Sequence, residues 1–153
     1  FLRQDIDFVK GRTVLEEAYQ AFEEIKRAAE RHLNEMPSQW PTAYEGVAFN
    51  PPDSNYLRTQ FRIDDPYDDT IGTGYHRERC QFQVFVLTTA GQGSGEAIRY
   101  AEEIRTRFKK GTFLLESGVR IHTLTTPKVG SANIVNGRIF VPVLIDLVGE
   151  VES

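Results

Sequence analysis

The chain begins with an apolar stripe at helical spacing, and this stripe determines what the later segments can pack against. Thr13 has the chemistry of an N-cap, and Glu16 three residues later completes a capping box. Pro37 and Pro41 end the pattern, because proline cannot continue a helix. The spacing therefore predicts an amphipathic helix of roughly six turns. Its apolar stripe is Leu15, Ala18, Phe22, Ile25, Ala29, Leu33 and Met36, and its polar face is Glu17, Glu24, Arg27, Glu30 and Arg31.

The pattern then changes to the two-residue period of β-strands. We predict a short strand at residues 43–49 and longer strands at Tyr56–Ile63 and Tyr75–Thr89. Residues 64–74, with the sequence DDPYDDTIGTG, separate the two longer strands and predict an acidic loop. One face of the longest strand is apolar and predicts a buried surface, formed by Cys80, Phe82, Val84 and Val86.

A glycine-rich stretch, GQGSG at residues 91–95, breaks the long strand and leads into a second amphipathic helix. Acidic residues come first in this helix and basic residues last, as the helix dipole favours. Gly111 lies where a left-handed C-terminal cap belongs. The apolar stripe of this helix is Ala97, Ala101, Ile104 and Phe108.

Strand candidates also fill the end of the chain. Asn136-Gly137 is a strong type I′ hairpin signal, and Pro142 indicates either an edge strand or a neighbour that does not need its N–H. Because strands come in blocks and do not alternate with helices, we predict an α+β fold, a two-layer arrangement of a mainly antiparallel sheet with two helices packed on it. The candidate strands are residues 112–115, 119–125, 134–135 and 138–148.

Composition excludes several classes of protein. The 153 residues fit one domain, which we assign to residues 13–153, with residues 1–12 as an N-terminal arm. Lys plus Arg is 18 against 22 for Asp plus Glu, and the net charge of −4 argues against a binder of nucleic-acid phosphates. The apolar runs are too short to cross a membrane, and the first residues do not form a secretory signal. We therefore expect a cytosolic protein, or part of a particle assembled in the cytosol.

The motifs that suggest chemistry are incomplete. The 91–95 loop lacks the lysine of a P-loop, and Glu96 occupies the third glycine of a dinucleotide fingerprint. His76 and Glu78 match the H-x-E of zinc deaminases, but Cys80 is the single cysteine of the chain and the required cysteine pair cannot form. Cys80 lies on an apolar strand face, and this position predicts a buried side chain that packs in the core. The sequence therefore predicts no catalytic residue, no cofactor and no metal site.

Two segments lack a periodic apolar face with which to dock on their own domain. They are the arm at residues 1–12 and the loop at 64–74, and we expect both to contact neighbouring subunits or a partner. A disordered terminal segment is the alternative for the arm. A solvated loop and a cation-binding loop remain alternatives for the acidic cluster, although it lacks the glycine and glutamate of an EF-hand. The candidate contact residues are Arg3, Asp5, Asp7, Lys10, Asp64, Asp65, Tyr67, Asp68 and Asp69.

Taken in order, these segments resemble the tail terminator or tail completion proteins of tailed bacteriophages. The resemblance runs through the helix ending at Pro37, AYEGVAFNPP at 43–52, YLRT at 56–59 and CQFQVFV at 80–86. It continues with the glycine-rich turn, the second helix and Gly111, and closes on Val141-Pro142-Val143, so that it covers residues 13–150. The succession of motifs carries the resemblance, since no single motif is specific.

The resemblance implies a structural virion protein at the head-proximal end of the phage tail. It implies a homo-oligomeric ring, a hexamer, that caps the tail tube, stops polymerisation of the major tail protein and joins the tail to the head-tail connector. DNA would pass through the lumen without specific binding. Two other functions stay open at this stage: another neck or connector protein, and a small α/β enzyme that binds a phosphate ligand at residues 91–95.

Overall fold

The computed structural model describes residues 14–63, 75–89, 91 and 93–152. Thr13, the arm at residues 1–12 and the acidic loop at 64–74 lie outside the described residues, so the predictions for them are not tested. Neither described helix is long and apolar enough to span a lipid bilayer. The elements are α1 (Val14–Asn34), β1 (Thr42–Ala43), β2 (Tyr56–Ile63), β3 (Tyr75–Thr89), α2 (Gly95–Arg107), β4 (Phe113–Glu116), β5 (Val119–Thr123), β6 (Lys128–Val129), β7 (Asn133–Val135) and β8 (Arg138–Glu152).

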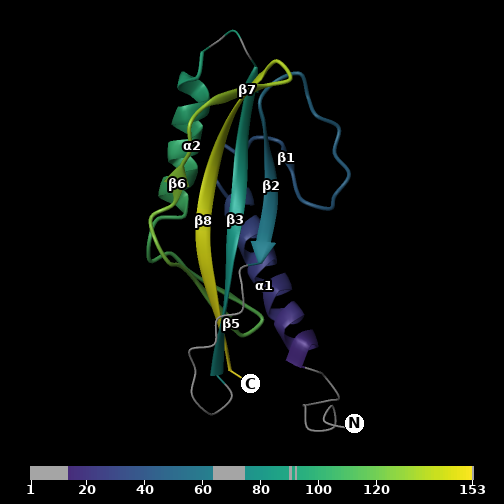
Figure 1. Ribbon diagram of the computed structural model, residues 1–153, viewed down its shortest axis with the longest axis vertical. Helices are drawn as coiled ribbons and strands as arrows, with labels where there is room; N and C mark the ends of the chain where they lie inside the picture. Colours follow the sequence, from purple (N-terminus) through teal and green to yellow (C-terminus); the bar gives the residue numbers. More distant parts are fainter. Residues whose placement is uncertain (1–13, 64–74, 90, 92, 153) are drawn as a thin grey trace.

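One curled sheet forms the body of the molecule (Figure 1). Its strand order is β1-β2-β3-β8-β5-β4, and β6 and β7 also pair with β8. β3 and β8 pair along their whole lengths, from Tyr75 opposite Glu152 to Thr89 opposite Arg138. All strand pairs are antiparallel except β1 with β2, which are parallel. The predicted α+β class, with a mainly antiparallel sheet and two helices, is confirmed.

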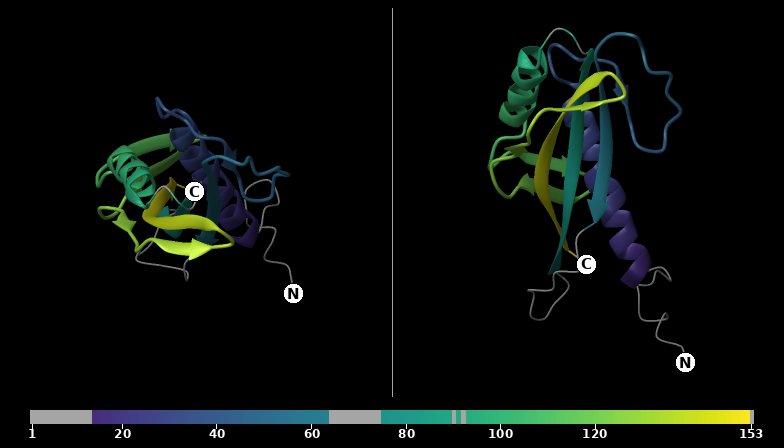
Figure 2. Two further views of the ribbon diagram at one scale, coloured as in Figure 1. Left: turned by 90° about the horizontal axis from the view of Figure 1, so that it is seen from above. Right: turned by 45° about the horizontal axis from the view of Figure 1, so that its top comes forward.

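The core lies between one face of the sheet and the two helices (Figure 2). The predicted apolar face of β3 is fully buried there, and the directly opposite residues of β8 extend it. Phe82 on β3 lies 5.9 Å, between ring centroids, from Phe108 at the end of α2. The buried side chains of β8 on this face are Ile139, Val141, Val143, Ile145 and Leu147.

Helix α1 buries more of its surface than the apolar stripe predicts. Ile25, Ala29 and Leu33 are fully buried as expected, but Glu24, which the pattern places on the polar face, is only 2% exposed. The reason is that α1 contacts the β4–β5 hairpin as well as β3 and β8, so a second surface covers its flank. The sequence pattern predicts which stripe of α1 faces the sheet. It does not predict that the β4–β5 hairpin covers the flank of the helix.

Gly149 on β8 permits the close approach of α1 to the sheet. A Cβ atom at Gly149 would lie 2.5 Å from Cδ1 and 2.8 Å from Cγ1 of Ile25, and 3.2 Å from Cγ1 of Val119. These distances are shorter than van der Waals contact, so any larger residue requires the helix or the hairpin to shift. The glycine therefore sets how tightly α1 packs.

Pro142 lies in β8, an internal strand, so the prediction of an edge strand is wrong. The other prediction holds, because the neighbouring strands do not need an N–H at this position. The N–H of Gly130 donates to the carbonyl oxygen of Pro142 at 2.8 Å. In an antiparallel strand the N–H and C=O of one residue point to the same side. The missing N–H therefore faces the break between β6 and β7, where the ladder to β8 is interrupted, and the ladder to β3 loses no bond.

Two local predictions were wrong. Of the strand predicted at 43–49, only Ala43 pairs, as the second residue of β1 (Thr42–Ala43), and Gly46 with a φ of 81° turns the chain away from β2. Gly111 is not the cap of α2, which ends at Arg107 and is capped by Phe108; with a φ of 88° Gly111 forms the turn that leads into β4. In both places a glycine with positive φ redirects the backbone, which is a conformation that other residues rarely adopt.

Candidate functional site

The nine candidate contact residues lie in the arm or the acidic loop, outside the described residues, so their role stays a prediction. The candidate site is therefore built from the surfaces of the described residues. The residues concerned are Arg3, Asp5, Asp7, Lys10, Asp64, Asp65, Tyr67, Asp68 and Asp69.

The glycine-rich turn precedes α2 without forming an anion site. Glu96 lies in the first turn of the helix, and its Oε1 accepts a hydrogen bond from Nδ2 of Asn55 at 3.0 Å. Ser94, the N-cap, makes no side-chain capping bond. A phosphate at this helix start would meet a carboxylate, which is unfavourable.

Cys80 and the histidines do not assemble into a site in the described part of the chain. Cys80 is fully buried, as expected of a core filler, and its Sγ lies 3.9 Å from the carbonyl oxygen of Leu147. His32 is on α1 and His122 on β5, while the side chain of His76 is not described. Within residues 14–63, 75–89, 91 and 93–152, no three His, Cys, Asp or Glu side chains form a group that could hold a metal ion.

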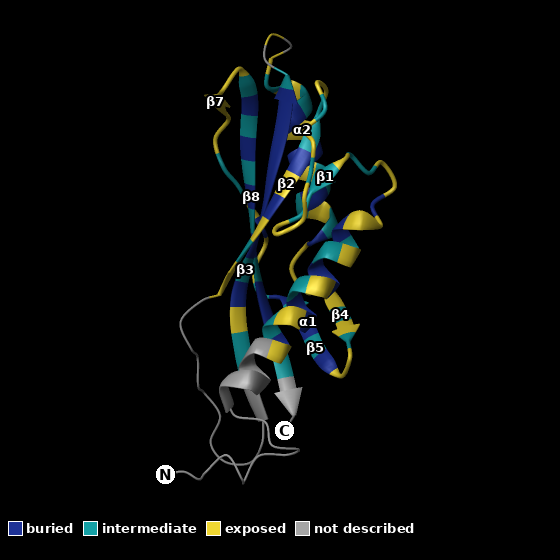
Figure 3. Ribbon diagram, turned by 90° about the vertical axis from the view of Figure 1, so that its right-hand side faces the viewer, coloured by how far each residue is buried: buried dark blue, intermediate teal, exposed yellow. Residues whose placement is uncertain are grey.

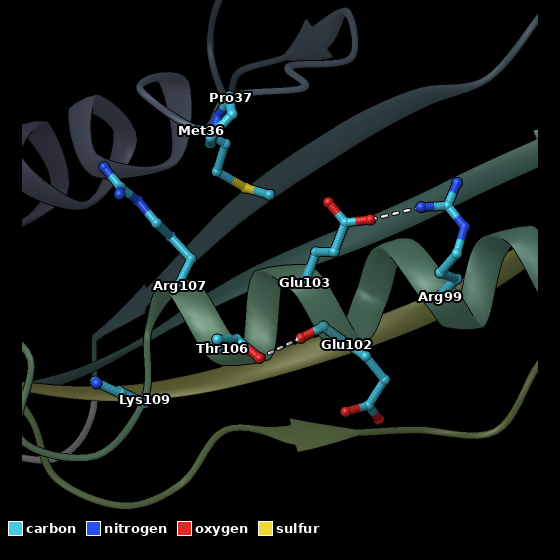
Figure 4. Close-up of a pocket in the computed structure, with 8 residues that line it drawn as sticks. All are labelled: Met36, Pro37, Arg99, Glu102, Glu103, Thr106, Arg107 and Lys109. Carbon is cyan, nitrogen blue, oxygen red and sulfur yellow. Dashed lines mark hydrogen bonds and ion pairs between the residues drawn. The ribbon is translucent and has the colours of Figure 1, made fainter.

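An open groove of about 700 Å³ lies between the end of α1 and the outer face of α2. Figure 4 shows Met36 and Pro37 on one side of it and the side chains of α2 on the other. Arg99 pairs with Glu103 at 2.6 Å, and Arg107 lies 3.9 Å from Glu35. Because these charges neutralise each other, the groove is poorly suited to bind an anion. Its lining is Met36, Pro37, Arg99, Glu102, Glu103, Thr106, Arg107 and Lys109.

Several titratable groups around α1 have shifted pKa values. Burial lowers the pKa of His32 and raises the pKa of Glu30, in each case as the largest cause. Burial also raises the pKa of Tyr100, whose hydroxyl donates to the carbonyl oxygen of Ser38 at 2.7 Å. His32 and Tyr100 bond to backbone carbonyl oxygens of the fold, and the three groups do not line the groove described above. Their shifts therefore describe packing rather than an acid–base pair.

Glu24 differs from Glu30, because its pKa is lowered and not raised. Hydrogen bonding from Ser117, and bonding and charge from Arg27, lower its pKa although burial acts against them. Nε2 of Gln20 also donates to its Oε1 at 3.2 Å. Glu24 is thus a buried carboxylate that bonds to Gln20 and Arg27 of its own helix, on the flank of α1 that contacts the β4–β5 hairpin.

The surface feature with the clearest chemistry is a pair of apolar strand edges. β4 ends the sheet, and its side chains alternate between the core and solvent. Phe113 and Leu115 each remain 58% exposed, whereas Leu114 packs on the core. Strand edges with exposed large apolar side chains are normally covered by another chain.

The second apolar edge is β7, at the hairpin with β8. Ile134 is 74% exposed, and the whole strand is exposed. Figure 3 shows β7 and β4 on opposite sides of the molecule. Sequence reasoning predicted the Asn136-Gly137 hairpin and strands at 112–115 and 119–125, but it missed both exposed surfaces. The alternation in 112–116 was the available signal, yet it does not tell which face the rest of the fold leaves uncovered.

Comparisons with known proteins identify the family of this chain. The profile of a family described as phage tail terminator protein matches residues 24–146. The chain belongs to this phage tail terminator family. The resemblance seen in the sequence is thereby confirmed over most of the chain.

Two solved structures have a similar fold over most of this chain. One, titled only with a sequence identifier, is 22% identical with a TM-score of 0.62, over 90% of this chain and 96% of that chain. Another, titled as the virion of a native gene transfer agent particle, is 16% identical with a TM-score of 0.63, over 88% of this chain and 99% of that chain. At these identities the likeness establishes the fold alone. A comparison with curated proteins finds no match.

This tail terminator is a structural protein of the virion tail, and it interacts there with other virion proteins. Its exposed strand edges suit that role, because they offer surfaces for protein contacts.

Proposed function

We propose that the protein assembles as a ring, a hexamer, that caps the head-proximal end of the tail tube. The ring stops polymerisation of the major tail tube protein and presents the surface to which the head-tail connector binds. The observation that carries this proposal is the family match over residues 24–146. The exposed strand edges support it, since a ring needs surfaces that contact other copies.

The proposed function contains no catalytic step. The shifted pKa values lie in packing contacts, and a carboxylate occupies the start of α2 where the alternative enzyme would need a phosphate site. A screen of thermal unfolding with nucleotides and inorganic phosphate tests this point. A specific rise in the unfolding temperature would contradict it, because a ligand at 100 times its Kd adds about 2.7 kcal/mol to stability.

The residues outside the described part have a place in this proposal. We assign residues 1–12 as an arm, residues 13–153 as the domain, and the arm and the loop at 64–74 as contacts to neighbouring subunits or to the tube. The net charge of −4 suits a lumen through which DNA passes without binding. A strongly basic lumen in the assembled ring would contradict that part.

Imaging of the protein mixed with purified tail tubes separates the terminator from a neck or connector protein. A terminator binds tubes at one end, because the two ends of a head-to-tail tube differ. A connector protein that binds the portal side leaves bare tubes uncovered. Tubes capped at one end support the proposal, and tubes free of protein contradict it.

A further inference from the structure

We propose that neighbouring copies in the ring join through the open edges of β4 and β7, so that β4 of each copy pairs with β7 of the next. The inference rests on the ring proposed above, and it identifies the two surfaces through which neighbouring copies would join. The partner at each edge is thus a second copy of this chain.

The backbone of β4 is arranged to accept a strand. Thr123 N–H donates to the carbonyl oxygen of Thr112 at 3.0 Å, so Thr112 bonds toward β5. Alternate residues of an antiparallel strand bond to the same neighbour, so Leu114 also bonds toward β5. Phe113 and Leu115 therefore turn their N–H and C=O groups outward. The same two residues carry the exposed apolar side chains.

β7 has the same arrangement at its own hairpin. The two-residue turn Asn136-Gly137, with φ angles of 50° and 74°, places Val135 opposite Arg138 as a bonded pair. Ile134, the next residue along the strand, therefore turns its N–H and C=O away from β8. Its side chain is the most exposed of the large apolar side chains in the described residues.

These two edges cannot satisfy each other within one copy, because they lie on opposite sides of the molecule (Figure 3). The view along the long axis also separates the β4–β5 hairpin from the β7–β8 hairpin (Figure 2). An open edge pairs with another strand, and main-chain bonds then supply affinity. Two different edges on opposite sides are what a head-to-tail interface requires, since every copy gives one and receives the other.

Charges beside the two edges are complementary. Lys109 and Lys110 are exposed just before β4. Asp53 is exposed beside β7, since Arg138, opposite Val135, donates to the carbonyl oxygens of Pro52 and Ser54. Contact between a basic and an acidic surface favours the pairing of β4 with β7 in one orientation.

Two variants of the full chain break one edge each. Phe113→Lys with Leu115→Lys charges the β4 edge, and Ile134→Lys charges the β7 edge. Val47→Lys is the matched control, because Val47 is 64% exposed but lies in neither edge. Assembly is measured by light scattering on the protein alone, and by negative-stain imaging of rings on tail tubes. We expect each edge variant to weaken ring formation about tenfold or more, and the control to assemble like the wild type.

Mixing the two edge variants gives the sharper result. A mixture holds one intact β4 edge and one intact β7 edge, so it should form a one-to-one dimer and no ring. Each variant alone should stay monomeric. Circular dichroism and thermal unfolding of each variant establish that its fold is kept, since all four substituted positions are exposed.

Three results would overturn the inference. They are edge variants that form rings as the wild type does, a mixture that stays monomeric although both variants are folded, and a variant that dimerises alone through its intact edge. If the wild type forms rings on tubes and the edge variants do too, only the edge assignment fails. If the wild type forms no ring alone or on tubes, the proposed function fails with it.

Discussion

His32 and Arg107 each bond to the backbone of the other. Nε2 of His32 lies 2.9 Å from the carbonyl oxygen of Arg107, and Nε of Arg107 donates to the carbonyl oxygen of His32 at 3.0 Å. The imidazole also lies edge-on to Phe108, with ring centroids 4.9 Å apart. The pair therefore joins the last turn of α1 to the end of α2, and its Nε2 must carry a proton to donate to a carbonyl.

Acidification should weaken this contact. Burial is the main cause that lowers the pKa of His32 below 6.5, so the folded state binds a proton less readily than the unfolded state. The stability from neutral His32 is full above the unfolded pKa and is lost as the pH falls through it toward the folded pKa. Urea unfolding of the wild type should lose more free energy between pH 7.5 and pH 5.5 than the His32→Gln variant does, because glutamine can donate without titrating. Equal losses in both proteins would contradict the assignment.

The close contact at Gly149 predicts that Gly149→Ala lowers the free energy of unfolding and that a second substitution restores part of the loss. Gly149→Ala places a Cβ 2.5 Å from Cδ1 of Ile25, and overpacking of this kind costs about 1–3 kcal/mol. Ile25→Val removes Cδ1, so the double variant should be more stable than the sum of the two single effects indicates. Chemical unfolding of the four proteins measures this coupling. Strict additivity would show that α1 does not pack on Gly149 as described.

The hydroxyl of Tyr100 bonds to the backbone of the segment that follows α1, at Ser38 and Trp40. It donates to the carbonyl oxygen of Ser38 at 2.7 Å and accepts from the N–H of Trp40 at 3.3 Å, while the indole of Trp40 stacks on the Tyr100 ring. Tyr100→Phe leaves these backbone groups without the buried hydroxyl and should cost about 1–3 kcal/mol of unfolding free energy. Tyr44→Phe is the control, since its hydroxyl bonds to Asn34 at an exposed position and its loss should cost less. A control that costs as much would refute the argument.

The arm and the acidic loop predict an effect on assembly. Deletion of residues 1–12, or replacement of Asp64, Asp65, Asp68 and Asp69 by serine, should weaken ring formation or tube capping, because both segments are proposed to reach neighbouring molecules. Light scattering and electron microscopy measure ring formation and capping. Unchanged assembly in both variants would remove these segments from the interface.

Long regular patterns made most of the fold predictable from sequence. β2 and β3 have the predicted limits, because a two-residue period sustained over many residues is compatible with one orientation of each side chain. The Asn136-Gly137 turn was predictable for a local reason, since two left-handed residues in succession favour Asn and Gly.

The errors share one physical cause, which is that tertiary partners cannot be read from a local pattern. Residues 43–49 have strand-prone side chains, but Gly46 turns the chain away from the one strand it could pair with. Glu24 is buried because a hairpin from residues 113–123 covers it. Phe113 and Leu115 alternate like core residues, yet the sheet ends at β4 and leaves them exposed.

Elongation of tail tubes tests the proposed function most directly. The major tail tube protein is polymerised from preformed starts, and the present protein is added at increasing ratios while tube lengths are measured by electron microscopy. The proposal predicts that tubes stop growing on addition and carry one ring at the growing end. Tubes that continue to lengthen at the same rate with saturating protein would contradict it.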